Sequence, residues 1–139
     1  MVKKNINSKN IILYAEDDED DQQLIKDSLQ KYSHDIEIVI HNNGVEALSY
    51  LNNLSPSDPA PCLIILDINM PKMNGIEALK QIRKNKRFAK VPAILFTTSS
   101  QPLDKKFAAE YKVGFITKPI DAAQMKYIAE TFIQYCETR

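Results

Sequence analysis

Short apolar runs alternate along this chain with segments whose apolar residues recur at helical spacing. The runs cover residues 11–15, 63–66, 91–96 and 113–117, and in residues 36–40 every second position is isoleucine. Runs of this length predict strands, and the alternating one predicts an edge strand with a less buried face. The helical sets that follow the five strands begin at Leu24, Val45, Ile76, Leu103 and Met125.

This order of strand and helix, repeated five times, predicts the fold class. It is typical of an α/β domain with a doubly wound parallel sheet, right-handed crossovers and helices on both faces. The 139 residues are enough for one ordinary domain, and residues 52–61, with three prolines, predict a surface loop rather than a domain linker. We therefore expect a single domain over residues 1–139.

The run at 63–66 ends at a single carboxylate, Asp67, and turn-forming residues follow it. Pro71 fixes its own φ and disfavours helix at the residue before it. Asn74 and Gly75 then provide a side-chain cap and an unhindered backbone where helical spacing resumes. Because ligands bind at the carboxyl ends of parallel strands, we expect Asp67 on a stiff loop at the binding edge of the sheet.

Polar side chains also follow three of the other strands: Glu16 and Asp17, Thr97, and Lys118. In a parallel sheet these residues and Asp67 share one edge. Three close carboxylates repel one another unless a cation offsets their charge, and oxygen ligands of this kind suit Mg²⁺. Mg²⁺ and Lys118 would together neutralise the three carboxylates, and a carboxylate is an established acceptor of phosphoryl groups. The sequence thus predicts a magnesium site beside a nucleophilic aspartate.

These residues together resemble the receiver domain of two-component response regulators. The resemblance is carried by Asp67 in LDINMPKMNG, by Glu16 and Asp17 after the first strand, by Thr97 after the fourth, and by Lys118-Pro119 after the fifth. It covers about residues 10–136. It implies a flavodoxin-like receiver fold, in which five parallel strands in the order 2-1-3-4-5 are flanked by five helices.

The resemblance also implies a role for each residue. Asp67 would be the phosphoacceptor, and Mg²⁺ would be held by Glu16, Asp17, Asp67 and the backbone carbonyl of Asn69. Lys118 would contact the phosphoryl group, and Thr97 would hydrogen-bond to it. Asp phosphorylation and dephosphorylation are the only reactions that such a domain catalyses, so we do not expect an enzyme of other substrates.

Thr97 and Phe115 occupy the family's switch positions. In the family the threonine moves toward the phosphoryl group and an aromatic ring swings into the vacated space. This alters the surface formed by the fourth helix, fifth strand and fifth helix, which binds partners. Phe115 stands where tyrosine is commoner. Because it has no hydroxyl that burial would leave unpaired, we expect its ring to lie inward in the resting state.

The resemblance implies a histidine kinase or histidine phosphotransferase as phosphodonor and a downstream protein as target. No room is expected for an output domain beyond the fifth helix. The chain is also similar to stand-alone regulators paired with bacterial phytochromes, some of which self-associate, so a homodimer stays open. The kinase, the target, the lifetime of the phosphorylated state, the oligomeric state and the activity of the resting state are not determined by the sequence.

Three other functions fit parts of the sequence. A phosphatase or phosphotransferase of the haloacid dehalogenase type also phosphorylates a strand-end aspartate, but it needs a second aspartate two residues later, where this chain has Asn69. A dinucleotide or flavin carrier needs a glycine-rich phosphate loop, and the three glycines form none. A phosphate-independent scaffold would keep the fold without binding Mg²⁺.

Charge adds little to this interpretation, because 18 basic and 18 acidic residues balance. Residues 18–21 are all acidic and are expected to form a solvated loop and helix start, where acids complement the helix dipole. Six cations lie within residues 80–90. They suggest either a nucleic-acid contact or a solvated helix end, and the absence of interleaved aromatic residues favours the helix end. We expect no nucleic-acid partner.

No apolar run is long enough to span a bilayer, and no signal peptide is recognisable at the N-terminus. We therefore expect a cytoplasmic protein that has no membrane partner. Cys62 begins an apolar run and Cys136 lies on the apolar stripe of the last helix. This pattern favours buried, reduced thiols over a disulfide or a metal site.

Overall fold

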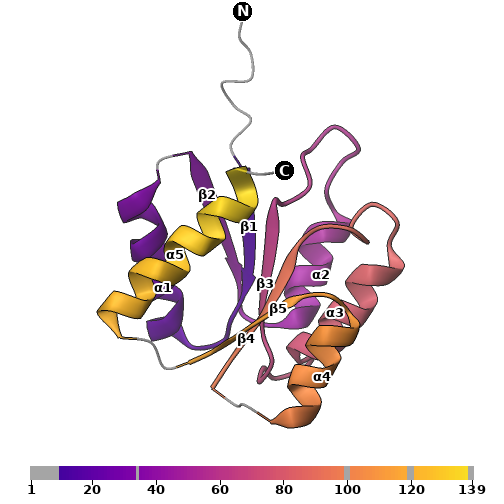
Figure 1. Ribbon diagram of the computed structural model, residues 1–139. Helices are drawn as coiled ribbons and strands as arrows, with labels where there is room; N and C mark the ends of the chain where they lie inside the picture. The colour runs from indigo at the N-terminus through magenta and orange to yellow at the C-terminus, as the bar shows by residue number, and fades with distance from the viewer. Residues whose placement is uncertain (1–9, 34, 99–100, 119–120, 138–139) are drawn as a thin grey trace, which may run out of the picture.

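The computed structural model describes residues 10–33, 35–98, 101–118 and 121–137. Across these residues five strands alternate with five helices along the chain (Figure 1). The elements are β1 (Asn10–Ala15), α1 (Glu19–Tyr32), β2 (Ile36–His41), α2 (Gly44–Asn52), β3 (Leu63–Asp67), α3 (Gly75–Lys84), β4 (Ala93–Thr97), α4 (Pro102–Glu110), β5 (Gly114–Thr117) and α5 (Ala122–Glu137).

The strands form one parallel sheet in the order β2-β1-β3-β4-β5. Helices α1 and α5 cover one face, and α2, α3 and α4 lie on the other (Figure 1). The predicted doubly wound fold is thus confirmed, including its strand order. The order reverses between β1 and β3, and ligands bind at the carboxyl ends of strands beside such a reversal.

The sheet separates two hydrophobic clusters. One packs beneath α1 and α5, and the other packs beneath α2, α3 and α4. Strands β3 and β4 are buried along their whole length, as their continuous apolar runs predicted. The residues of β2 are exposed or half-buried, which confirms the prediction of an edge strand.

Side-chain caps fix where several helices begin. Asp18 caps α1 by accepting hydrogen bonds from the backbone N–H groups of Asp20 and Asp21, and Asn43 caps α2 through the N–H of Glu46. Before α5, the side chain of Asp121 accepts a hydrogen bond from the backbone N–H of Gln124 at 2.8 Å. Such caps satisfy N–H groups that a helix leaves without partners in its first turn.

The prediction of two separate thiols is wrong. Cys62 and Cys136 are both buried, but they form a disulfide whose Cα atoms lie 5.0 Å apart. Cys62 directly precedes β3, and Cys136 lies in the last turn of α5, which packs on the same face of the sheet. Sequence reasoning missed the pair because the two residues are 74 positions apart and meet only when α5 docks.

The basic segment at residues 80–90 has a partly structural role. Arg83 donates hydrogen bonds to the backbone carbonyls of Phe88 and Val91, and Arg87 donates to carbonyls of the 52–61 loop. These bonds tie the turn after α3 to its neighbours, which agrees with the helix-end interpretation. None of the helices in the described ranges is both long and apolar enough to cross a bilayer.

Candidate functional site

Strand register brings the expected site residues to one edge of the sheet. Ala15, the last residue of β1, is paired with Leu66 of β3, so Glu16, which follows β1, and Asp67, which ends β3, emerge side by side. On the other side of β3, Asp67 itself is paired with the residue before Thr97 in β4. Lys118 follows β5, and its backbone N–H donates to the Thr97 carbonyl at 2.6 Å. Four neighbouring strands therefore end at the same level.

The loop after β3 is shaped by the residues that the sequence singled out. Asn74 forms a reciprocal capping box with Glu77 at the start of α3. Gly75 donates its N–H to the Ile68 carbonyl at 3.1 Å and lies so close to the backbone of Asp67 that a Cβ atom would clash with the Asp67 carbonyl oxygen. Helix α3 can approach the Asp67 peptide this closely only because residue 75 is glycine.

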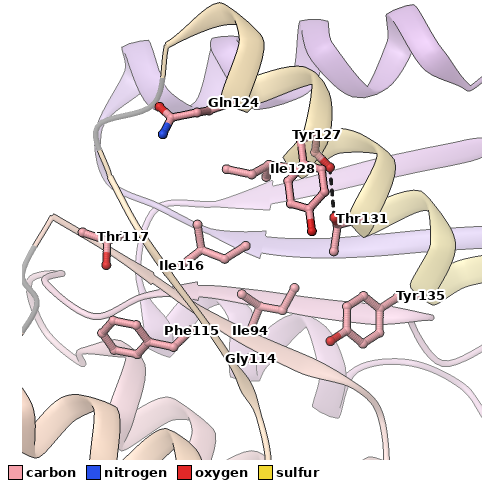
Figure 2. A pocket seen from close by; sticks show the side chains of 10 residues that line it. All are labelled: Ile94, Gly114, Phe115, Ile116, Thr117, Gln124, Tyr127, Ile128, Thr131 and Tyr135. Atoms are coloured by element: carbon pink, nitrogen blue, oxygen red, sulfur yellow. Dashed lines mark hydrogen bonds between the residues drawn. The ribbon is translucent and has the colours of Figure 1, made fainter.

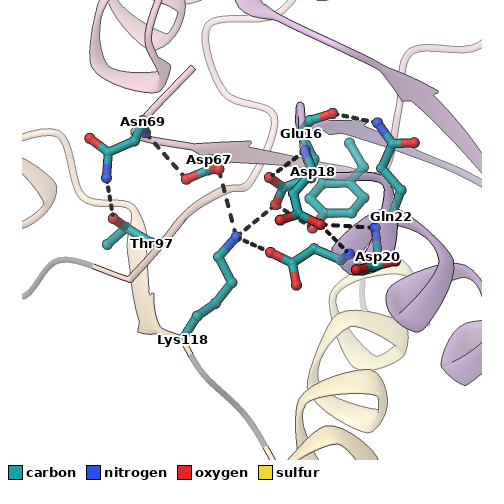
Figure 3. A network of polar contacts seen from close by, with 10 residues as sticks. Glu16, Asp18, Asp20, Gln22, Asp67, Asn69, Thr97 and Lys118 are labelled. Carbon is teal, nitrogen blue, oxygen red and sulfur yellow. Dashed lines mark hydrogen bonds and ion pairs between the residues drawn. The ribbon is translucent and has the colours of Figure 1, made fainter. Parts of the chain in front are cut away.

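Lys118 lies at the centre of the polar network (Figure 3). Its ammonium nitrogen is 2.8 Å from Glu16 Oε1, 2.7 Å from Asp21 Oδ2 and 3.6 Å from Asp67 Oδ2. The side chains of Lys118, Glu16 and Asp67 are all buried. Burial by itself would lower the pKa of Lys118, but the hydrogen bonds to Asp21 and Glu16 and the negative charge of Asp67 raise it, so the ammonium remains charged.

Glu16 is fully buried and is held from several directions. The Tyr14 hydroxyl donates to Glu16 Oε1 at 2.8 Å, and the Asp18 N–H donates to Oε2 at 3.3 Å. Burial, reinforced by the charge of Glu16, raises the pKa of Tyr14 far above its usual value, so its hydroxyl stays a donor. The Gln22 side chain donates to the Glu16 carbonyl at 2.5 Å and also to Asn42.

Asp67 lies in an environment that disfavours its charge. Burial, followed by the hydrogen bond and charge of Glu16, raises its pKa to about 7. The Lys118 ammonium and the backbone N–H of Asn69, which donates to Asp67 Oδ1 at 3.2 Å, oppose this rise but do not cancel it. A further cation at this edge would restore the charged carboxylate.

Three of the predicted ligands fit such a cation. Single carboxylate oxygens of Glu16, Asp17 and Asp67 lie within 4.8 Å of one another, with Asp17 on the exposed side. An all-oxygen set that is partly open to solvent suits a hard divalent ion that keeps some of its waters. The contact between Asp21 and Lys118 changes the predicted charge balance. Four carboxylates now face one ammonium, so a divalent ion leaves one negative charge when Asp67 is ionised.

The remaining predicted residues lie beside this cluster. Asn69 is exposed, and its side-chain amide donates to the hydroxyl of buried Thr97 at 3.4 Å (Figure 3). Whether the Asn69 carbonyl binds a metal stays a prediction. Phe115 is half-buried and packs against the cluster beneath α2, α3 and α4, so its ring is not wholly solvent-facing. Pro119 lies outside the described residues.

A separate hollow of about 450 Å³ lies between β5 and α5 (Figure 2). Its walls include Ile94, Ile116, Ile128 and the exposed ring of Tyr127. Gly114 also lines it, in β5, which is an edge strand of the sheet that the described residues form. The hollow is apolar over much of its wall and does not include the carboxylates of the strand-end cluster.

Sequence reasoning missed two members of the network, Asp21 and Tyr14. Asp21 was expected to be solvated with its acidic neighbours, yet it contacts Lys118. Tyr14 was counted only as part of an apolar strand, yet its hydroxyl bonds to Glu16. The contact of Tyr14 could have been predicted from the sequence, because side chains two residues apart along a strand lie on the same face and Tyr14 precedes Glu16 by two residues.

The sequence model of the response regulator receiver domain matches residues 12–130. The chain therefore belongs to the receiver domain family. Receiver domains are signalling modules of two-component systems that bind a divalent metal and interact with histidine kinases and phosphotransfer proteins. They are generally not enzymes, which agrees with the expectation from the sequence.

Named relatives of this receiver domain include response regulators of similar length. Response regulator Rcp1 from Synechocystis is 32% identical over 115 residues, which are 81% of this chain and 78% of Rcp1. A chemotaxis protein CheY homolog from Campylobacter jejuni is 29% identical and aligns with 83% of this chain and 85% of its own.

Solved structures of response regulators have the same fold as this chain. The crystal structure of the Mn²⁺-bound form of Rcp1 gives a TM-score of 0.80 at 28% identity, over 94% of this receiver domain and 96% of that chain. The structure of the phosphorylated cyanobacterial phytochrome response regulator RcpA gives 0.81 at 27% identity, over 94% and 95%.

Proposed function

We propose that this receiver domain accepts a phosphoryl group on Asp67 from a histidine kinase or histidine phosphotransferase, in the presence of Mg²⁺. The observation that carries the proposal is the convergence of Glu16, Asp17, Asp67 and Lys118 at the ends of three strands. Each of these groups is needed for one part of phosphoryl transfer, which depends mainly on positioning and on electrostatic stabilisation.

The metal ligands in this proposal are one carboxylate oxygen each from Glu16, Asp17 and Asp67 and the backbone carbonyl of Asn69. A bound Mg²⁺ would keep Asp67 ionised and offset negative charge on the phosphoryl oxygens. In the metal-free protein the pKa of Asp67 is raised to about 7, so part of the population carries a proton on the nucleophile. This cost of charging Asp67 is the physical reason for a requirement for the ion.

The chain's own groups account for the rest of the step. An ionised oxygen of Asp67 forms a bond to phosphorus while the P–N bond of the donor phosphohistidine breaks, and the imidazole leaves. The Lys118 ammonium, 3.6 Å from Asp67, is close enough to bind a phosphoryl oxygen after a small shift. The Thr97 hydroxyl lies next to the site and would bind another phosphoryl oxygen.

Phosphorylation would act on a partner surface through Thr97 and Phe115. Thr97 ends β4, and its carbonyl accepts a hydrogen bond from the N–H of Lys118, which follows β5. Phe115 lies within β5, which borders the hollow against α5. We propose that movement of Thr97 toward the phosphoryl group shifts Phe115 and so changes the α4-β5-α5 surface. A downstream protein, or a second copy of the chain, would bind there, and the reaction would take place in the cytoplasm.

Labelling with acetyl phosphate, and with phosphorylated kinases of the host, tests this proposal. Intact-mass spectrometry should show one added phosphoryl group on the wild-type chain with Mg²⁺, and its loss after treatment with hydroxylamine, which cleaves acyl phosphates. Chelation of Mg²⁺ should abolish the labelling.

Asp67→Asn should remain unlabelled under the same conditions. Asp20→Asn is the matched control, because it removes an acid from the exposed first turn of α1 instead. Equal labelling of Asp67→Asn would refute the site. A wild-type chain that no donor labels with Mg²⁺ present would refute the function and favour a phosphate-independent scaffold.

A further inference from the structure

Asp21 lies closer to the Lys118 ammonium than Asp67 does. The Asp21 Oδ2 to Lys118 Nζ distance is 2.7 Å, and the Asp67 Oδ2 to Nζ distance is 3.6 Å. An ammonium–carboxylate hydrogen bond is usually shorter than about 3 Å, so Lys118 is bonded to Asp21 and Glu16 and only near Asp67. The group that would bind the phosphoryl oxygen is therefore held by Glu16 and by Asp21 of α1.

The contact between Asp21 and Lys118 depends on the position of the first turn of α1. The N–H of Asp21 donates to the Asp18 cap at 3.1 Å, which fixes the first helical turn at this edge of the sheet. The positive end of the helix dipole favours a carboxylate at that place. The Asp21 side chain is 32% exposed, whereas that of Lys118 is 7% exposed, so Asp21 contacts the ammonium from the solvent side.

We propose that Asp21 is a positioning residue that holds Lys118 away from Asp67 and so slows phosphorylation. This inference rests on the proposed function. Glu16 and Asp21 each accept one of the three ammonium hydrogens, so a phosphoryl group at Asp67 can use only the third, and the bond to Asp21 resists movement of the nitrogen toward it. Removing the Asp21 charge leaves Lys118 bonded to Glu16 and able to move toward Asp67.

Rates of labelling by acetyl phosphate at saturating Mg²⁺ test the proposal. Asp21→Asn should be phosphorylated about fivefold faster than wild type, the factor expected when a partly exposed ion pair of about 1 kcal/mol no longer opposes the transition state. Asp21→Glu keeps the charge and should restore a rate near that of wild type.

Asp20→Asn is the matched control, because it removes the same charge from the same turn of α1. Its rate should stay within about twofold of wild type, as expected for an exposed charge screened by solvent. A rate for Asp21→Asn that equals or falls below that of Asp20→Asn would overturn the proposal. Urea unfolding of each variant checks that α1 remains folded.

Crystal structures of the metal-free proteins give a readout that does not depend on phosphorylation. In Asp21→Asn the Lys118 Nζ to Asp67 distance should shorten from 3.6 Å to a hydrogen-bonded contact of about 2.8 Å. An unchanged position of Lys118 would overturn the proposal even if rates differ. If the wild-type chain is never labelled, the proposed function fails, while these structures still decide what Asp21 does to Lys118.

Discussion

Breaking the disulfide between Cys62 and Cys136 should lower the stability of the fold strongly. The bond joins the residue before β3 to the last turn of α5, and both cysteines lie in the core cluster beneath α1 and α5. Reduction leaves this core in place but frees the unfolded chain from a long closed loop. The perturbation therefore acts mainly on the unfolded state.

The size of the effect follows from the sequence separation. For residues 74 apart, the chain-entropy model gives a loss of about 4 kcal/mol on reduction. Small domains are stable by only about 5–15 kcal/mol, so this is a large share of the total. With a urea m-value of about 2 kcal/mol/M, the midpoint of unfolding should fall by about 2 M.

Urea unfolding followed by circular dichroism, with and without dithiothreitol, measures this shift. The double variant Cys62→Ala with Cys136→Ala is the control, because its midpoint should not respond to the reductant. Thiol titration of the unfolded, unreduced protein should find no free cysteine. Coincident midpoints in a chain shown to contain the bond would refute the entropic reasoning, and two free thiols would refute the bond itself.

Two further predictions concern the loop and the acid at the end of β3. The folded pKa of Asp67 is raised to about 7, so the folded state keeps a proton that the unfolded chain has lost above about pH 4, and stability without metal should fall between these values. At about 1.4 kcal/mol per pH unit the loss is at most about 4 kcal/mol. Urea midpoints at pH 5 and pH 8 with a chelator measure the part of this loss above pH 5, about 3 kcal/mol, and a decline that persists in Asp67→Asn would contradict this cause. Gly75→Ala should lower the free energy of unfolding by about 2–3 kcal/mol in the same assay, because the alanine Cβ would clash with the Asp67 backbone. In Gly114→Ala the nearest atoms to the new Cβ belong to the Ile94 side chain, so the loss of stability should be smaller. A loss of stability for Gly75→Ala that is equal to or smaller than that for Gly114→Ala would count against this account.

The sequence by itself determined the order of the elements and grouped the polar residues that directly follow the strands. Strands buried on both faces need continuous apolar runs, and crossovers between parallel strands need helices, so both leave periodic patterns that can be read locally. Once the strands are parallel, their carboxyl ends must share an edge. Glu16, Asp67, Thr97 and Lys118 could therefore be grouped without coordinates, although about a hundred residues separate the first from the last.

Only the tertiary structure decided which of these groups touch and what else joins them. The contact of Asp21 with Lys118 depends on where α1 begins over the sheet edge, and one acid among several in a row carries no local sign of that choice. The disulfide depends on the docking of α5, which brings Cys136 to Cys62. Likewise Leu103 fits the helical pattern of α4 but is 76% exposed. Periodicity states which face of an element is apolar, whereas the distance between two side chains is set by how whole elements pack against one another.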